Sequence, residues 1–356
     1  MNVKELLQKM LQAGISDMHF KAGSPPILRV NGKLSPTPYE PFQAKVVEEF
    51  ASSLMTDEQK ARFKEDCELD LSYCVDGVSR FRVNVYRQKG TVALTLRVVP
   101  LQVHTFAELN MPAEALAKLA GEARGLVLFA GVTGSGKTTT LNSVIDHINR
   151  NSSCQIVTIE DPIEFYHTDV KSSIAQREVG PDTRSFKNAL KYALRQDPDV
   201  IVIGEMRDFD AVSAALTAAE TGHLVLSTIH TMDAVQTLDR IIDVFPAHQQ
   251  AHVRVQLSNV LRGVVAQRLL PGKDGKGRWP AAEVLIVSSL VKKLIAEGKP
   301  QDIHKAMEQG QYYKMQTFDQ DLLRLVREEK VALEEALEGA SSPDDLALKA
   351  RGIGSG

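Results

Sequence analysis

The segment from Leu126 to Thr138 constrains this chain more than any other. Its apolar start, Leu-Val-Leu-Phe-Ala, predicts a buried strand, and the loop Gly131-Val-Thr-Gly-Ser-Gly136-Lys137-Thr138 follows at once. The loop matches the pattern GxxxxGK[ST], in which glycines let backbone N–H groups turn inward and cradle phosphates. A helix is predicted after the loop, and its positive end would face the same anion. The alternative is a chance glycine-rich turn, and the combination of strand, loop and helix argues against it.

This loop predicts a P-loop ATPase whose cofactors are ATP and Mg²⁺. Lys137 should reach the β- and γ-phosphates, and Thr138 should be a ligand of Mg²⁺. The predicted nucleotide-binding residues are Gly131, Thr133, Gly134, Ser135, Gly136, Lys137, Thr138 and Thr139.

Apolar runs that alternate with helical stretches predict an α/β fold class for the central part of the chain. The runs are residues 126–130, 156–159, 200–203 and 224–227. Uninterrupted apolar runs indicate parallel strands that are covered on both faces, as in a doubly wound sheet.

Residues 1–99 predict a small α+β domain. Period-two alternation at 80–85 and 91–98 indicates strands with one covered face. Turns are predicted at Asn31-Gly32 after a strand at 27–30, and at Asp76-Gly77 between two strands. Helices are predicted at 3–13, 43–54 and 57–66.

The remaining boundaries follow from prolines and from helical patterns. Residues 100–112, with Pro100 and Pro112, are the predicted linker, and 113–288 are the predicted ATPase core. Residues 289–356 are predicted to be a helical region with a disordered tail. Its helical patterns are 289–297, 301–309, 318–328 and 331–338.

Composition excludes several classes of protein. The net charge of −3 argues against bulk nucleic-acid binding, although a basic channel could hide in an average. The first twelve residues lack the apolar core of a signal peptide, and no apolar run approaches the roughly eighteen residues of a membrane-spanning helix. Cys67, Cys74 and Cys154 form no CxxC pair, so no disulfide and no zinc site are predicted, as expected for a cytosolic protein.

Acidic residues follow two of the predicted strands. Residues 200–203 lead into Gly204-Glu205, the Walker B arrangement, which places a carboxylate beside the metal and the attacking water. Thr158-Ile-Glu160-Asp161-Pro162-Ile-Glu164 follows another strand, at the edge where α/β sheets hold ligands. The alternatives are an ordinary strand end for the first segment and a solvated acidic turn for the second.

Histidines and arginines complete the predicted site. His230 follows the strand at 224–227, where it could sense the γ-phosphate, while His223 opens that strand. A lone histidine is more often structural. Arg80 and Arg82 share one strand face, and Arg97 lies on the polar face of a later strand; solvated surface arginines are the alternative.

Four segments in this order resemble the Walker A, Asp box, Walker B and His box of the secretion-ATPase superfamily. They are GVTGSGKTTT, TIEDPIEF, VIGEMRD and TGHLVLSTIHT. ISDMHF, PPILRVNGKL, RFRVNVYRQKG, RIIDVFP and AQRLLP extend the resemblance over nearly the whole chain. The superfamily includes the type II and type IV secretion motors and the type IV pilus motors.

The resemblance implies a PAS-like N-terminal domain and a RecA-like core in a cytoplasmic homohexamer. Such a ring works at the inner-membrane base of the pilus machine, on a membrane platform protein; it is peripheral to the membrane and contacts no nucleic acid directly. The implied catalytic residues are Glu164, Glu205, His230, Arg80, Arg82 and Arg97, and the implied supporting residues are Glu160, Asp161, Arg207 and His223. Thr138 and Glu205 would hold Mg²⁺, mostly through water, and the arginines would approach the nucleotide.

Within the superfamily the chain most resembles the retraction ATPases of type IV pili. It reaches ISDMHF by residue 16 and lacks a four-cysteine metal site, whereas extension and secretion motors usually have an added N-terminal region and such a site. Retraction ATPases carry the motif AIRNLIRE; residues 290–297 keep Leu294, Ile295 and Glu297 of it and differ elsewhere. The alternatives are an accessory retraction paralogue, a DNA or protein transport motor, and a nucleotide-binding regulator without hydrolysis.

Overall fold

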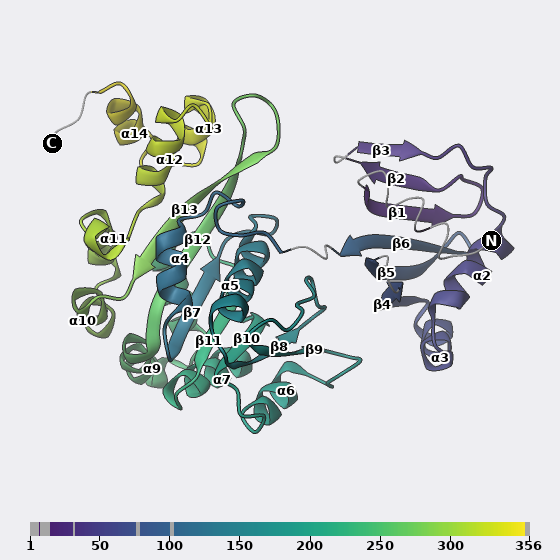
Figure 1. Cartoon of the computed structure of the whole chain (residues 1–356), viewed down its shortest axis with the longest axis horizontal. Coiled ribbons are helices and arrows are strands. Elements are labelled where there is room, and N and C mark those ends of the chain that lie inside the picture. Colours follow the sequence, from purple (N-terminus) through teal and green to yellow (C-terminus); the bar gives the residue numbers. More distant parts are fainter. Residues whose placement is uncertain (1–6, 8–14, 31–32, 76–78, 100–102, 353–356) are drawn as a thin grey trace. The chain divides into compact units, whose positions relative to one another are not determined.

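The computed structural model describes residues 7, 15–30, 33–75, 79–99 and 103–352 (Figure 1). The predicted helix at 3–13, the turns at 31–32 and 76–77 and the end of the tail fall outside these residues, apart from Leu7. The chain forms two compact units, Met1–Gln102 and Val103–Gly356.

The first unit contains one antiparallel sheet with the strand order β3-β2-β1-β6-β5-β4. Its strands are β1 (Ile15–Lys21), β2 (Ile27–Val30), β3 (Lys33–Pro36), β4 (Glu68–Val75), β5 (Ser79–Gln88) and β6 (Thr91–Val99). The two predicted helices are confirmed as α2 (Ala44–Leu54) and α3 (Asp57–Asp66). The alternating apolar residues of β5 and β6 are buried in a core that α2 and α3 also line.

The second unit is built on a seven-stranded sheet with the order β13-β12-β7-β11-β10-β8-β9. Its strands are β7 (Gly125–Ala130), β8 (Gln155–Glu160), β9 (Ser173–Glu178), β10 (Val200–Glu205), β11 (Leu224–Ile229), β12 (Leu261–Pro271) and β13 (Arg278–Ile286). The four predicted apolar strands are confirmed as β7, β8, β10 and β11, and they are parallel where they pair. The sequence did not predict β13, which runs antiparallel to β12 at one edge.

Helices join and cover these strands. They are α4 (Ala113–Ala120), α5 (Lys137–Asn151), α6 (Phe186–Ala193), α7 (Phe209–Glu220), α8 (Ala234–Asp243) and α9 (Ala247–Val260). The four C-terminal helical patterns are confirmed as α10 (Ser289–Glu297), α11 (Pro300–Glu308), α12 (Phe318–Arg327) and α13 (Leu333–Glu338), and the structure adds the short helix η1 (Gln311–Tyr313) and α14 (Pro343–Ala350). Among the described residues, no helix combines the length and the apolar character that crossing a bilayer requires.

The C-terminal helices are attached to the sheet through β12. The guanidinium carbon of Arg268 lies 4.0 Å from the ring centroid of Phe318 on α12, a cation–π contact. The same guanidinium donates a hydrogen bond to the carbonyl oxygen of Gly339, just after α13. The C-terminal helices therefore belong to the same compact unit as the sheet.

The prediction of a linker over residues 100–112 needs correction for its described part. Residues 103–112 belong to the second unit, where Phe106 and Met111 are buried in the core. The carbonyl oxygen of His104 accepts a 2.6 Å hydrogen bond from the Ser143 hydroxyl of α5. Apolar side chains and this hydrogen bond hold residues 103–112 against the sheet unit, so this part of the predicted linker is packed.

A buried carboxyl fixes the start of α8. Glu283 on β13 is 2% exposed, and its Oε1 accepts a 2.8 Å hydrogen bond from the backbone N–H of Ala234. Burial raises the pKa of Glu283 from its ordinary value of 4.5 to about 6. Since the folded state binds this proton more tightly, the stability it contributes is complete below about pH 4.5 and is lost as the pH rises through about 6.

We predict that Glu283→Gln becomes more favourable, relative to the native chain, as the pH rises. The amide keeps an acceptor for Ala234 but carries no charge, so the difference in free energy of unfolding should shift by about 2 kcal/mol in favour of glutamine between pH 4.5 and 7.5. Urea unfolding at both values measures it, with the exposed Glu308→Gln as control. A difference that does not change with pH would contradict the assignment of this buried charge.

Candidate functional site

Four of the predicted motifs meet at one edge of the second sheet. Strands β7, β11, β10 and β8 are neighbours in that order and point the same way. Their carboxyl ends carry the glycine-rich loop, His230, Glu205 and Glu160 respectively. Because all four strands end at the same edge, the four motifs lie together there, at the edge where α/β sheets hold ligands.

Three positions of the loop between β7 and α5 have backbone conformations that favour glycine. Gly131, Gly134 and Gly136 have φ angles of 152°, 79° and 92°. A Cβ on Gly131 would lie 2.7 Å from the carbonyl oxygen of Gln267, and a Cβ on Gly136 would lie 2.6 Å from the Gln267 Nε2. Backbone conformation favours glycine at all three positions, and lack of space adds to this at Gly131 and Gly136. A glycine-rich loop of this kind can turn backbone N–H groups toward an anion.

Lys137 opens α5 and is only 6% exposed. Its Nζ donates a 3.2 Å hydrogen bond to the carbonyl oxygen of Val132, within the same loop. Burial lowers the pKa of the Lys137 amine, while the charges of Glu205 and Glu164 act in the opposite direction. A buried ammonium group beside two carboxylates is suited to bind phosphate oxygens.

The residues present fit a nucleoside triphosphate with Mg²⁺. The Ser135 hydroxyl is buried and has no hydrogen-bond partner among the described residues, so a bound phosphate could supply one. Thr138 and Thr139 lie half-buried in the first turn of α5, next to the loop. A hydroxyl at this position, together with Glu205, is the oxygen donor set that Mg²⁺ prefers.

Glu205 is held between two nitrogen donors. Its Oε2 lies 2.8 Å from Arg207 Nη2, and its Oε1 lies 3.1 Å from His230 Nε2. The hydrogen bond to Glu205 raises the pKa of Arg207, and the charge of Asp161 adds to this effect. The structure therefore brings together Glu205, Arg207, His230 and Asp161, all of which were predicted for the site.

The acidic segment after β8 is not a solvated turn at its start. Glu160 is 6% exposed, and its Oε1 accepts hydrogen bonds from the Thr158 hydroxyl at 2.7 Å and from Gln176 Nε2 at 3.1 Å. Burial raises the pKa of Glu160. Asp161 and Glu164, by contrast, are exposed. Of the two glutamates in this segment, Glu160 and Glu164, only Glu164 is therefore accessible to a ligand.

Side chains that the sequence analysis missed connect this segment to α5. Gln176 on β9 donates to the carbonyl oxygen of Phe165 at 2.8 Å and accepts from the backbone N–H of His167 at 2.8 Å. His167 Nε2 lies 2.8 Å from Asn142 Oδ1, and Asn142 Nδ2 donates to the Thr138 carbonyl at 2.9 Å. Burial lowers the pKa of His167 to about 4, so its ring is neutral near pH 7.

His223 is the predicted site residue that the second unit places elsewhere. It precedes β11, so it lies at the amino edge of the sheet, where its carbonyl accepts a hydrogen bond from Gly125 N–H at 2.9 Å. His230 follows the end of the same strand, seven residues later and about 23 Å away at the usual rise per residue. His223 is therefore not part of the phosphate site of its own chain.

The predicted arginines belong to the first unit. Arg82 lies opposite Arg97 in the β5–β6 register, which confirms the shared face. Arg97 Nε donates to Asp17 Oδ1 at 2.8 Å, while 66% of its side chain stays exposed. Burial would raise the pKa of Asp17, but hydrogen bonds from Arg97 and Ser16 outweigh it and lower the pKa. The buried carboxylate of Asp17 thus orients Arg97. This contact argues against the alternative, a freely solvated surface arginine.

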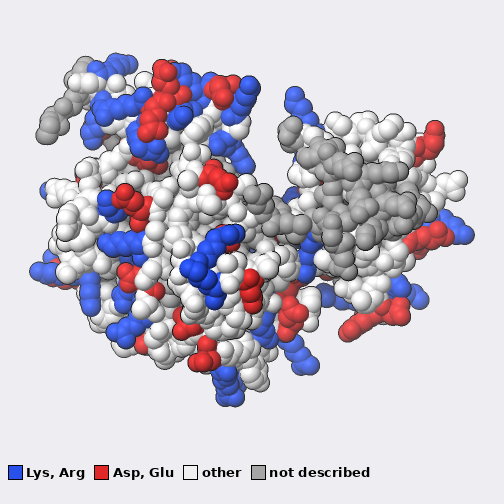
Figure 2. Space-filling model, in the orientation of Figure 1, with Lys and Arg blue, Asp and Glu red and all other residues white. Residues whose placement is uncertain are grey.

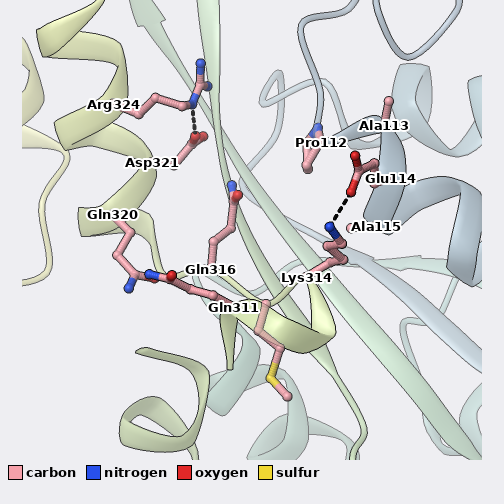
Figure 3. A pocket seen from close by; sticks show the side chains of 11 residues that line it. Pro112, Ala113, Glu114, Ala115, Gln311, Lys314, Gln316, Gln320, Asp321 and Arg324 are labelled. Atoms are coloured by element: carbon pink, nitrogen blue, oxygen red, sulfur yellow. Dashed lines mark hydrogen bonds and ion pairs between the residues drawn. The ribbon is translucent and has the colours of Figure 1, made fainter. Parts of the chain in front are cut away.

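Two pockets of the second unit differ in their relation to the loop. The first, of about 580 Å³, adjoins the loop and is lined by Val132, Thr133, His230, Thr231, Met232, Gln236, Asp239, Arg240 and Asp243. The second, of about 440 Å³, lies between α4, η1 and α12, and none of its lining residues belongs to the four motifs (Figure 3). Its charges pair internally, Glu114 with Lys314 at 2.5 Å and Asp321 with Arg324 at 2.8 Å.

Comparisons with known proteins agree over almost the entire chain. The profile of the type II/IV secretion system protein family matches residues 1–338. The type IV pilus retraction ATPase PilT of Pseudomonas aeruginosa is 43% identical over 346 residues, which cover 97% of this chain and 100% of that protein. The type IV pilus ATPase PilU of the same organism is 41% identical over 348 residues, covering 98% and 91%.

A solved structure is also similar. The crystal structure of the pilus retraction motor PilT with bound ADP superposes with a TM-score of 0.92 at 42% identity, covering 98% of this chain and 99% of that chain. The α/β architecture of both units is therefore that of a nucleotide-binding protein of known structure.

Proposed function

The chain belongs to the type II/IV secretion system protein family, and we propose that it is an ATPase motor that powers the retraction of type IV pili. One observation carries the proposal: a glycine loop, a buried lysine and two carboxylates lie together in a chain similar to PilT along nearly its full length. The first unit is proposed to be PAS-like and the second RecA-like.

Catalysis is proposed to consist of positioning and charge stabilisation, because phosphoryl transfer asks little covalent chemistry of the protein. Lys137 and the loop N–H groups hold the phosphates. Thr138 and Glu205 would hold Mg²⁺, which neutralises phosphate charge. Glu164 is proposed to polarise the attacking water, since it is exposed and its charge reaches Lys137.

We predict that Glu205→Gln and Glu164→Gln each leave ATP binding intact and lower turnover on the order of 10²-fold or more, as expected when a general base is lost. Phosphate release measures turnover, and titration with a non-hydrolysable ATP analogue measures ATP binding. Glu122→Gln is a control, because Glu122 pairs with Arg262, away from the motifs. Near-normal turnover in Glu164→Gln would remove this residue from the mechanism.

The arginines of the first unit are proposed to neutralise phosphate charge during hydrolysis. A guanidinium can bind two phosphate oxygens at once, and comparable arginines are worth roughly 10³–10⁵ in rate. Arg80 is included with Arg82 and Arg97 because it shares their sheet face. ATP would then supply the differential affinity that a conformational change in a motor requires.

Arg97→Ala and Arg82→Ala should lower turnover far more than they weaken ADP binding. Arg97→Lys should rescue incompletely, because lysine lacks the planar fork. Arg87→Ala serves as control: this arginine lies over Phe63, with its guanidinium carbon 5.7 Å from the ring centroid. Equal losses of ADP and ATP affinity, with unchanged turnover per bound ATP, would show that Arg82 and Arg97 only support the fold.

The motor is proposed to act as a homohexamer in the cytoplasm, peripheral to the inner membrane at the pilus base, on the platform protein. Heterologous interfaces produce a closed ring when the rotation that relates neighbouring subunits closes on itself. Light scattering with nucleotide measures the subunit number.

On the face that Figure 2 shows, Lys and Arg are interspersed with Asp and Glu over the second unit. This mixture favours a protein substrate over nucleic acid, which binds to continuous basic surfaces.

Helix α10 contains residues 290–297, where the chain departs from the retraction motif. Leu294 and Ile295, two of the kept residues, are 8% and 3% exposed, whereas Leu290 is 56% exposed. Packing of α10 alone accounts for keeping the buried pair.

Deletion of the gene tests the proposed function. Loss of twitching with excess pili is the expected result, because pili that cannot retract accumulate. Lost pili would indicate an extension motor, and unchanged twitching would indicate that another ATPase suffices. A phosphate-release assay on the purified protein separates the motor from a regulator that binds ATP without hydrolysis.

A further inference from the structure

Gln267 lies where β12 passes behind the phosphate loop. The two strands β12 and β7 are parallel, and Ala266 pairs with Ala130, the last residue before the loop. Gln267 is the next residue of β12 and is 5% exposed. A polar side chain buried at this point must use its hydrogen-bonding groups on the loop or on α5.

The side chain and backbone of Gln267 reach the loop at both ends. Its Oε1 accepts a 2.7 Å hydrogen bond from the hydroxyl of Thr140, which is 1% exposed in the first turn of α5. Its Nε2 occupies the space that a Cβ on Gly136 would need, and its carbonyl oxygen occupies the space that a Cβ on Gly131 would need. One residue of β12 therefore lies against the first glycine, the last glycine and the helix that follows.

We propose that Gln267 is a positioning residue for phosphate binding. Glycine allows the loop its three left-handed conformations, but it also leaves the loop many others, which must be excluded before the N–H groups converge. The Gln267 amide excludes them by contact and by the bond to Thr140. Donors that are fixed in advance bind phosphate more tightly and stabilise charge in the transition state without reorganisation.

This inference rests on the proposed ATPase function but concerns only nucleotide binding at the loop. Gln267→Met keeps the size of the side chain and removes its polar groups, while Thr140→Val removes the donor. Each should weaken ADP binding about tenfold, the factor expected from one buried hydrogen bond, and should lower turnover as well. Because the two changes remove the same bond, the double variant should be little worse than either single variant.

Gln316→Met is the matched control. Gln316 also donates an amide hydrogen bond, to the carbonyl oxygen of Ala282 at 2.7 Å, but it lines the pocket of Figure 3 and not the loop. This variant should lower the melting temperature and leave ADP affinity unchanged. Thr140→Ser keeps the hydroxyl and should restore most of what Thr140→Val loses, which separates the hydrogen bond from packing.

Titration of folded protein with ADP decides the matter. Unchanged ADP affinity and turnover in Gln267→Met, with only a lower melting temperature, would show that Gln267 is merely structural. If that variant fails to fold, normal ADP affinity in Thr140→Val overturns the proposal by itself. Should the native protein bind ADP without releasing phosphate from ATP, the ATPase proposal fails, while the ADP affinities still test Gln267.

Discussion

The second unit is organised around the loop between β7 and α5, in which two glycines leave no room for a side chain. Between Ala130 and Lys137 the chain turns through three glycines with positive φ, and two of these face atoms of Gln267 at distances that no Cβ could tolerate. The three glycines contribute no side chains that could stabilise the loop. Its shape comes from what surrounds it: β7 before it, α5 after it and β12 behind it.

Charge balance is the second condition that the site satisfies. Lys137 is buried and would be unstable as a cation without anions near it, and Glu205 and Glu164 provide them. Glu205 in turn contacts Arg207 and His230, so its carboxylate has partners within the protein. Phosphate brings additional negative charge to this group, and under the proposed function the contacts of Glu205 would have to rearrange for it to hold a metal.

Local sequence patterns predicted those features that are determined by residues adjacent in the chain. Apolar runs gave β7, β8, β10 and β11, and alternation gave β5 and β6, because burial on one or both faces of a strand appears directly in the order of residues. The glycine loop was predictable for the same reason. Strand β9, Ser-Ile-Ala-Gln-Arg-Glu, is a half-exposed edge strand without such a pattern, and it was missed.

The missed residues depend on distant parts of the chain. Thr140 and Gln267 are 127 positions apart, and nothing near Gln267 in the sequence distinguishes it from another polar residue of a strand. The same holds for Gln176, which joins Glu160 to the backbone near His167. His223 failed as a prediction for the opposite reason: its closeness in sequence to the motif concealed that one strand separates it from the site.

Adjacent side chains on β12 serve different neighbours. Gln267 faces the loop, whereas Arg268 contacts Phe318 and the carbonyl oxygen of Gly339 in the C-terminal region. Successive side chains of a strand point to opposite faces, so these two residues contact different neighbours. Because Gln267 and Arg268 share one peptide unit, a displacement of either residue also displaces the other. The C-terminal helices are therefore not an exchangeable module. A chimera of two family members would have to take β12 and its helices from the same parent, or the graft would disturb the nucleotide loop from behind.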